Sequence, residues 1–109
     1  METKKGTKAP YAIDDELLQD ITQVFIESNL NIMASVSAAM ECGKIEEAHR
    51  LMHILKSTVP YFGLEELGVL VQNAEGILIK GMKLPDELFQ ELEEKLAQDL
   101  QKLTERFII

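Results

Sequence analysis

Two histidines four residues apart, in the stretch AHRLMHIL (48–55), are the side chains of this sequence best suited to chemistry. A neutral imidazole nitrogen that solvent can reach is a competent nucleophile for phosphorus. Lys56, one helical turn after His53, could offset the negative charge of a phosphoryl product on that ring. Ser57, also one turn away, is small and leaves room for a partner to approach. The pattern predicts His53 as a nucleophile and Lys56 as the cation beside it.

A helix must hold these residues at that spacing, and the whole chain favours helices. Apolar residues recur at steps of three and four, in four stripes separated by short connections. The stripes predict helices over about 14–42, with a break near Ser28–Asn31, over 44–62, around 67–78 and over 85–107. Short connections make sequential helices antiparallel neighbours, so we expect an all-α, up-down four-helix bundle. Residues 13–109 would form the bundle, and residues 1–12, with clustered lysines, a flexible N-terminal tail.

The predicted second helix turns His53 away from the core. Its apolar stripe consists of Ile45, Ala48, Met52, Leu55, Val59 and Phe62. At about 100° per residue, His53 lies roughly 130° from the middle of that stripe, and His49 lies about 40° closer to it. We therefore expect His53 to be exposed and His49 to lie at the edge of the core. Pro60 lacks the N–H that would bond to the Lys56 carbonyl, so we expect a bend there without a break.

Charge and composition limit the partners. The chain carries 19 acidic and 11 basic residues, a net charge of −8, so it would repel a phosphate backbone and nucleic acid is not an expected partner. Residues 14–42 carry six acids and no Lys or Arg, whereas residues 43–63, around His53, have a net charge of +1. A single cysteine, Cys42, excludes an internal disulfide, and no apolar run is long enough to span a membrane. These features predict a cytoplasmic protein without a membrane partner.

The spacing from His53 onward resembles the signature of the histidine-containing phosphotransfer (HPt) domain family. That signature is a histidine, a lysine three residues on, a small residue four on, a glycine ten on and a leucine one turn later. Here the matching residues are His53, Lys56, Ser57, Gly63 and Leu67. The likeness extends upstream through DDELLQDITQVFIES and AAMECGKIEEA, and downstream through LVQNAE. Ser57 stands where the family usually has glycine, which adds one hydroxyl to the exposed face.

The resemblance implies a phosphorelay carrier that is not an enzyme by itself. His53 would accept a phosphoryl group from a receiver-domain aspartate and pass it to another response regulator, with Lys56 stabilising the group. The implied partners are receiver domains of response regulators or hybrid histidine kinases, and the magnesium site would belong to the receiver. Gly63 and Leu67 complete the structural motif, and we expect a monomer with no cofactor or metal of its own. The exposed flank of the second helix would dock the partner through His49, Arg50, Ser57 and Pro60.

Two other interpretations stay open at this point. Glu46-x-x-His49 has the spacing found in di-iron bundles, but the chain has only two histidines, which leaves at most a surface zinc site through His49 and His53. Alternatively, a degenerate member of the family could bind a receiver as an interaction module without carrying phosphate. Detection of phosphohistidine after incubation with a phosphorylated receiver would separate these interpretations.

Overall fold

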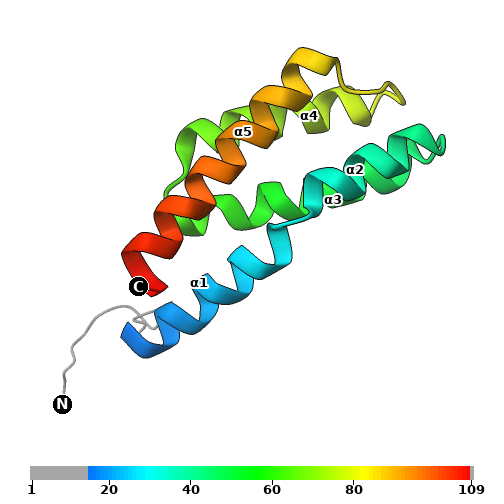
Figure 1. Ribbon diagram of the computed structural model, residues 1–109. Coiled ribbons are helices and arrows are strands. Elements are labelled where there is room, and N and C mark those ends of the chain that lie inside the picture. The colour runs from blue at the N-terminus through cyan, green and yellow to red at the C-terminus, as the bar shows by residue number, and fades with distance from the viewer. Residues whose placement is uncertain (1–14, 109) are drawn as a thin grey trace.

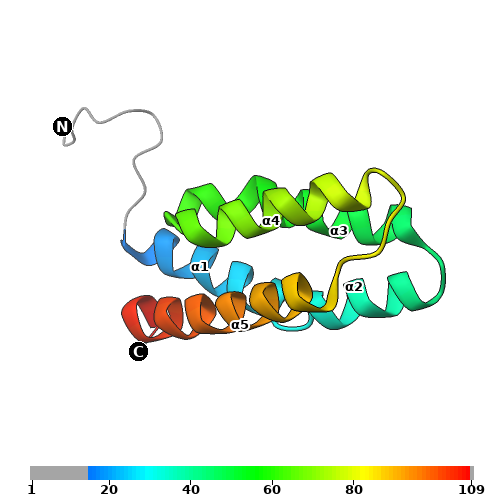
Figure 2. The ribbon, with the colours of Figure 1, turned by 90° about the horizontal axis from the view of Figure 1, so that it is seen from above.

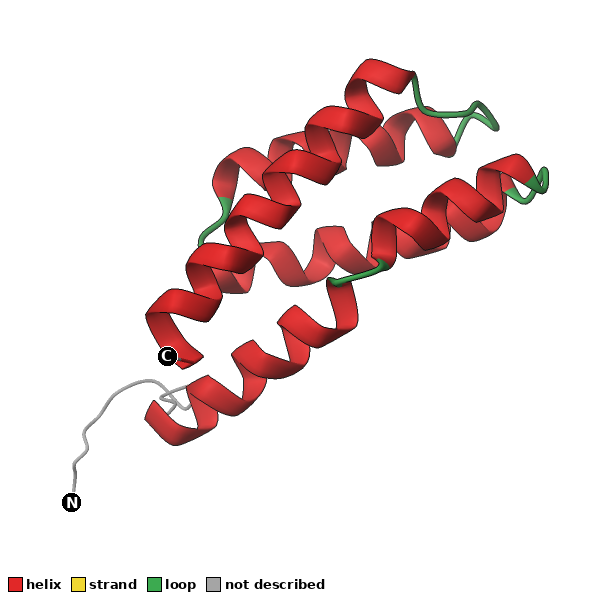
Figure 3. Ribbon diagram, viewed as in Figure 1, coloured by secondary structure: helices red, strands yellow, loops and turns green. Residues whose placement is uncertain are grey.

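The structure is a computed structural model that describes residues 15–108, so the predicted tail over 1–12 lies outside the described residues. The described residues form helices and connecting turns without any strand (Figure 3). The elements in chain order are α1 (Asp15–Asn29), α2 (Ile32–Glu41), α3 (Ile45–Thr58), the 3-10 helix η1 (Val59–Phe62), α4 (Glu65–Leu78), α5 (Asp86–Leu103) and the π-helical turn η2 (Thr104–Ile108). The predicted all-α bundle is confirmed, with its first helix divided into α1 and α2.

The break between α1 and α2 lies at Leu30 and Asn31, inside the predicted segment. Asn29 ends α1 and is buried, and its side-chain nitrogen donates a hydrogen bond to the Phe25 carbonyl at 2.8 Å. An asparagine side chain that bonds to the backbone in this way competes with continuation of the helix. The break changes the direction of the chain. As a result, α2 packs on α3, while α1 packs on η2 and the end of α5 (Figure 1).

The core lies between α2, α3, α4 and α5, which run side by side (Figures 1 and 2). Large apolar side chains with no exposed surface hold these helices together: Val36, Met52, Leu55, Leu67, Val71 and Leu92. Burial of each such side chain contributes about 1.5–3 kcal/mol before the cost of ordering the chain. Leu67, one of the residues of the predicted motif, is therefore a core residue of α4.

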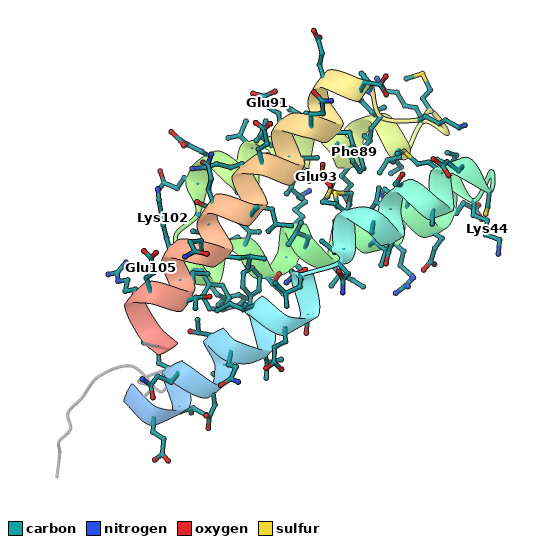
Figure 4. The ribbon with its side chains drawn as sticks, in the orientation of Figure 1. Lys44, Phe89, Glu91, Glu93, Lys102 and Glu105 are labelled. Atoms are coloured by element: carbon teal, nitrogen blue, oxygen red, sulfur yellow. The ribbon has the colours of Figure 1, made fainter. Side chains whose placement is uncertain are left out.

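Helix α5 completes the bundle with one apolar and one charged side. Leu92, Leu96 and Leu100 are buried, at the four-residue spacing predicted for this helix. Figure 4 shows charged side chains such as Glu91 and Lys102 along its outer side, while Phe89 packs against the core. No helix within residues 15–108 is long and apolar enough to cross a membrane.

Pro60 has a different effect on α3 from the one predicted. The α-helix ends at Thr58, and the chain continues as η1, with Pro60 at its second position, instead of as a bent α-helix to Phe62. Because Pro60 has no N–H for the Lys56 carbonyl, the last turn tightens into 3-10 geometry. Gly63 then closes η1 with a φ of 68°, a left-handed conformation that glycine adopts without strain. The helix that carries Lys56 is regular up to that residue.

Candidate functional site

His53 lies on the exposed side of α3, as its position on the helix predicts. Its side chain is 63% exposed, whereas Met52 and Leu55 on either side are fully buried. Among the described residues, the ring is held at one nitrogen: Nδ1 lies 2.5 Å from Oε2 of Glu75, on the neighbouring helix α4. His53 is thus both reachable from solvent and fixed in orientation by the bundle.

Glu75 is the centre of a cluster that joins α3 to α4. Its Oε1 lies 2.9 Å from the Lys56 ammonium, and its Oε2 faces His53 and, at 3.3 Å, Nε2 of His49. Glu75 itself is only 8% exposed. A carboxylate that is withdrawn from water needs partners of this kind, because an unpaired buried charge is costly.

The contact with Glu75 selects the tautomer of His53. An ionised carboxylate can only accept hydrogen bonds, so the hydrogen of the neutral imidazole sits on Nδ1, the nitrogen that faces Glu75. The other nitrogen, Nε2, then carries the lone pair. The arrangement therefore gives an exposed histidine with one fixed nucleophilic nitrogen.

The electrostatics of the cluster keep Glu75 ionised. The hydrogen bond from Lys56 lowers the pKa of Glu75 below its ordinary value of 4.5, and the contact with His53 adds to this effect. Burial raises the pKa of Glu75, since it disfavours the charged form, and this effect is larger than that of His53 but smaller than that of Lys56, so the pKa is lowered on balance. Near neutral pH the carboxylate is therefore available as a hydrogen-bond acceptor for His53.

The lowered pKa of Glu75 predicts a loss of stability in acid. A carboxyl group whose pKa is lower in the folded protein stabilises the fold above the unfolded value, and this contribution disappears as the pH falls through the folded value. We expect the parent to have a higher Tm than Glu75→Gln at neutral pH, and this difference to shrink as the pH falls from about 4.5 downwards. Thermal unfolding of both proteins across that range measures it. A difference in Tm that stays constant down to strongly acidic pH would contradict the expectation.

The other predicted residues lie around this cluster in different situations. His49 is half-buried, at the edge of the core, and the structure brings it to Glu75. Arg50 is exposed and pairs with Glu47 through two short contacts, at 2.6 and 2.9 Å. Ser57 is exposed and its hydroxyl donates to the Ile54 carbonyl at 2.8 Å. Pro60 is also exposed, and Gly63 forms the turn after η1.

An apolar groove of about 760 Å³ opens between α1, the start of α2 and the end of α3. Phe25 and Phe62 stack at its floor, with ring centroids 4.3 Å apart. The side chains that form its rim are strongly exposed, with Val24 at 62% and Tyr61 at 83%. Ile54, the residue after His53, also lines the groove, whereas His53, Lys56 and Glu75 are not among its lining residues.

Glu75 is the member of this cluster that the spacing of the sequence does not predict. It lies four residues after Val71 and three before Leu78, both buried, so a charged residue occupies a position inside the apolar stripe of α4. An acid at a core position is a signal of a paired or functional group. Within residues 15–108, no three side chains of His, Cys, Asp or Glu are arranged to hold a metal ion.

Comparison with known proteins identifies the family. No curated protein and no solved structure is similar enough to the chain to count as a match. A family model, described as Hpt domain, matches residues 20–105, which include α2 to α5 and most of α1. The match contains His53, Lys56 and Glu75, and it covers most of the chain. With the helical bundle and the exposed histidine on α3, this match shows that the chain belongs to the Hpt domain family.

Proposed function

We propose that His53 is the phosphorylated residue of a phosphorelay carrier, which accepts the phosphoryl group from a receiver-domain aspartate and passes it to another response regulator. Hpt domains are phosphoryl carriers of phosphorelays, which gives the class of function. The observation that carries the assignment to His53 is its contact with Glu75, because this contact leaves Nε2 as an unprotonated nucleophile on an exposed ring.

The chemistry assigned to His53 balances without any further reagent. The Nε2 lone pair attacks the phosphorus of an aspartyl phosphate, so an N–P bond forms while the O–P bond to the aspartate breaks and the carboxylate leaves. The hydrogen on Nδ1 stays in place, and the positive charge that develops on the ring faces the Glu75 carboxylate. The reverse reaction transfers the group to the next aspartate. The magnesium ion and the acidic pocket belong to the receiver, in line with the family resemblance.

Lys56 supplies the positive charge for the phosphoryl group. Its ammonium is bound to Glu75 in the structure, but the side chain is 45% exposed and lies one turn from His53. A long side chain at that position can turn from the carboxylate to a phosphoryl group on the exposed ring, where it would form a charge-assisted hydrogen bond. The role predicted for Lys56 thus requires a change of partner during the reaction.

The receiver docks, in this proposal, over the apolar groove and the exposed flank of α3. Ile54, the residue after His53, lines the groove, so a partner seated on it would lie close to the ring on the same helix. Exposed apolar side chains next to a reactive group are typical of a protein interface. The predicted docking residues Arg50 and Ser57 lie on α3, Pro60 follows on η1, and His49 adds its exposed edge. We further infer that the protein acts as a monomer in the cytoplasm.

A charge placed on the groove should weaken receiver binding. Val24 is 62% exposed on the rim of the groove, and Val69 is 58% exposed on α4, away from it. We expect Val24→Lys to raise the Kd for the receiver by about tenfold, because a lysine would lose apolar contact and place an unpaired charge in the interface. Val69→Lys introduces the same change and should leave the Kd near that of the parent. Calorimetric titration checks both, and equal effects of the two variants would exclude the groove as the docking surface.

The test of the proposed function is phosphorylation itself. The protein is incubated with a phosphorylated receiver domain and magnesium, and transfer is followed as acid-labile, base-stable phosphate on the chain. Its appearance would support the carrier. Binding of the receiver with no transfer to the chain would instead favour the degenerate interaction module, and binding of zinc that competes with labelling would favour a surface metal site through His49 and His53.

A further inference from the structure

Nε2 of His49 is a buried polar atom without a well-formed hydrogen bond. It has no exposed surface, and no hydrogen-bond partner of acceptable geometry lies around it in the described part of the chain. Its nearest acceptor is Oε2 of Glu75, at 3.3 Å. A lone pair at Nε2 would face the carboxylate and be repelled, so this nitrogen carries a hydrogen directed toward an acceptor that is already in use.

The same oxygen serves His53, and a carboxylate oxygen has room for two donors. His53 Nδ1 is closer, at 2.5 Å, and its ring lies beside that of His49, with centroids 6.1 Å apart. Lys56 holds the other oxygen, Oε1. Glu75 therefore orients His53 through one close contact. Two further contacts, from Lys56 and His49, can keep the Glu75 carboxylate in place.

The contacts of Lys56 and of His49 with Glu75 differ in whether they would persist during phosphoryl transfer. In the proposed reaction Lys56 leaves Glu75 and turns toward the phosphoryl group. A carboxylate released from its ammonium partner would be free to rotate or to follow the lysine, and either movement would take Oε2 away from His53. His49 is more buried than Lys56, at 27% against 45% side-chain exposure, so it stays in the cluster.

We propose that His49 is a positioning residue, which holds the Glu75 carboxylate at His53 when Lys56 turns to the phosphoryl group. The proposal rests on the proposed function and deepens it, since it assigns a part in the site to a residue that the sequence places only at the docking surface. The 3.3 Å contact is then a reserve hydrogen bond, which shortens when the lysine leaves.

The test uses the tautomer of His53, which requires no phosphorylation. The ¹⁵N shifts of the two ring nitrogens report which of them carries hydrogen, and they are compared in the parent, Lys56→Met, His49→Leu and the double variant. We expect the Nδ1–H form to dominate in the parent and in both single variants, because one holding contact remains in each. The double variant should lose this preference and show a mixture of tautomers. Such non-additivity is what two redundant contacts to one group produce.

A rate measurement tests the same proposal during transfer. Phosphorylation of His53 by a phosphorylated receiver should be about tenfold slower in His49→Leu, since a hydrogen bond to a charged group is lost when Lys56 leaves. His49→Gln, which keeps an N–H donor, should restore a rate near that of the parent. Circular dichroism verifies folding, and His49→Met replaces the leucine variant if helix is lost.

Two results would overturn the role of His49. One is a loss of the Nδ1–H form in Lys56→Met alone, to the level of the double variant, because His49 would then hold nothing. The other is a double variant that keeps the Nδ1–H form. If His53 still becomes phosphorylated, either result contradicts the role of His49 and not the proposed function. If His53 is not phosphorylated, the proposed function is contradicted, and the tautomer measurement still tests the role of His49.

Discussion

His53→Gln should abolish acid-labile labelling by a phosphorylated receiver, whereas His49→Gln should leave most of it. Only His53 combines a 63% exposed side chain with a ring nitrogen whose hydrogen is fixed by Glu75. The His49 nitrogen that faces Glu75 is buried, so a receiver cannot reach it. Spacing agrees, since Lys56 and Gly63 follow His53 at the intervals of the Hpt signature. Glutamine has a similar size and no nucleophilic nitrogen, so the expected loss is complete.

The two glutamine variants control for each other, because they make the same replacement on the same helix. Both should keep the helical content and the thermal stability of the bundle, since neither histidine is a core residue. Stability of the label in base and its loss in acid identify a phosphoramidate and exclude phosphate esters at Ser57 or Thr58. Labelling that persists in His53→Gln would end the assignment, and a shift of the label to His49 would show that exposure does not decide the acceptor.

The sequence was sufficient to predict the helices and the direction of His53, because both depend on local periodicity. The stripe of α3, from Ile45 to Leu55, fixes which side of that helix is buried, and His53 follows from rotation alone. Gly63 caps η1 and Gly81 lies in the turn after α4, both at positive φ, which glycine adopts without strain. The interruption near Asn31 was also predictable, since a cluster of asparagines and serine disfavours a continuous helix.

The partner of His53 depends on tertiary structure and could not be predicted in the same way. Glu75 is 22 residues away, and it meets His53 only because α4 packs beside α3 at a particular rotation. Its position inside an apolar stripe indicates that it is unusual without identifying its partners. The groove has a similar origin, since it depends on the angle that the break at Leu30 gives to α1. The effect of Pro60 could not be predicted fully either. The sequence shows that its N–H is missing, but both a bent α-helix and a 3-10 turn are compatible with the loss of that hydrogen bond.

Loss of the Glu75 side chain should have the second largest effect on phosphorylation. In Glu75→Ala, His53 would lose the acceptor that fixes its tautomer, and the positive charge that develops on the ring would lose its counter-charge. A hydrogen bond to a charged group is worth about 1.5–3 kcal/mol, which corresponds to a rate about 10- to 100-fold lower. The rate is to be measured in a single turnover with saturating phosphorylated receiver, so that weaker docking does not contribute.

Two further variants distinguish position from charge in this effect. Glu75→Gln keeps an oxygen that can accept from Nδ1 of His53 but removes the charge, so we expect a rate between those of the parent and Glu75→Ala. Glu65→Ala removes an exposed acid from the first turn of the same helix and should leave the rate unchanged. If Glu75→Ala were as fast as Glu65→Ala, the contact between Glu75 and His53 would have no part in the transfer. If Glu75→Gln were as slow as Glu75→Ala, the negative charge facing the ring, and not the hydrogen bond alone, would be what accelerates the reaction.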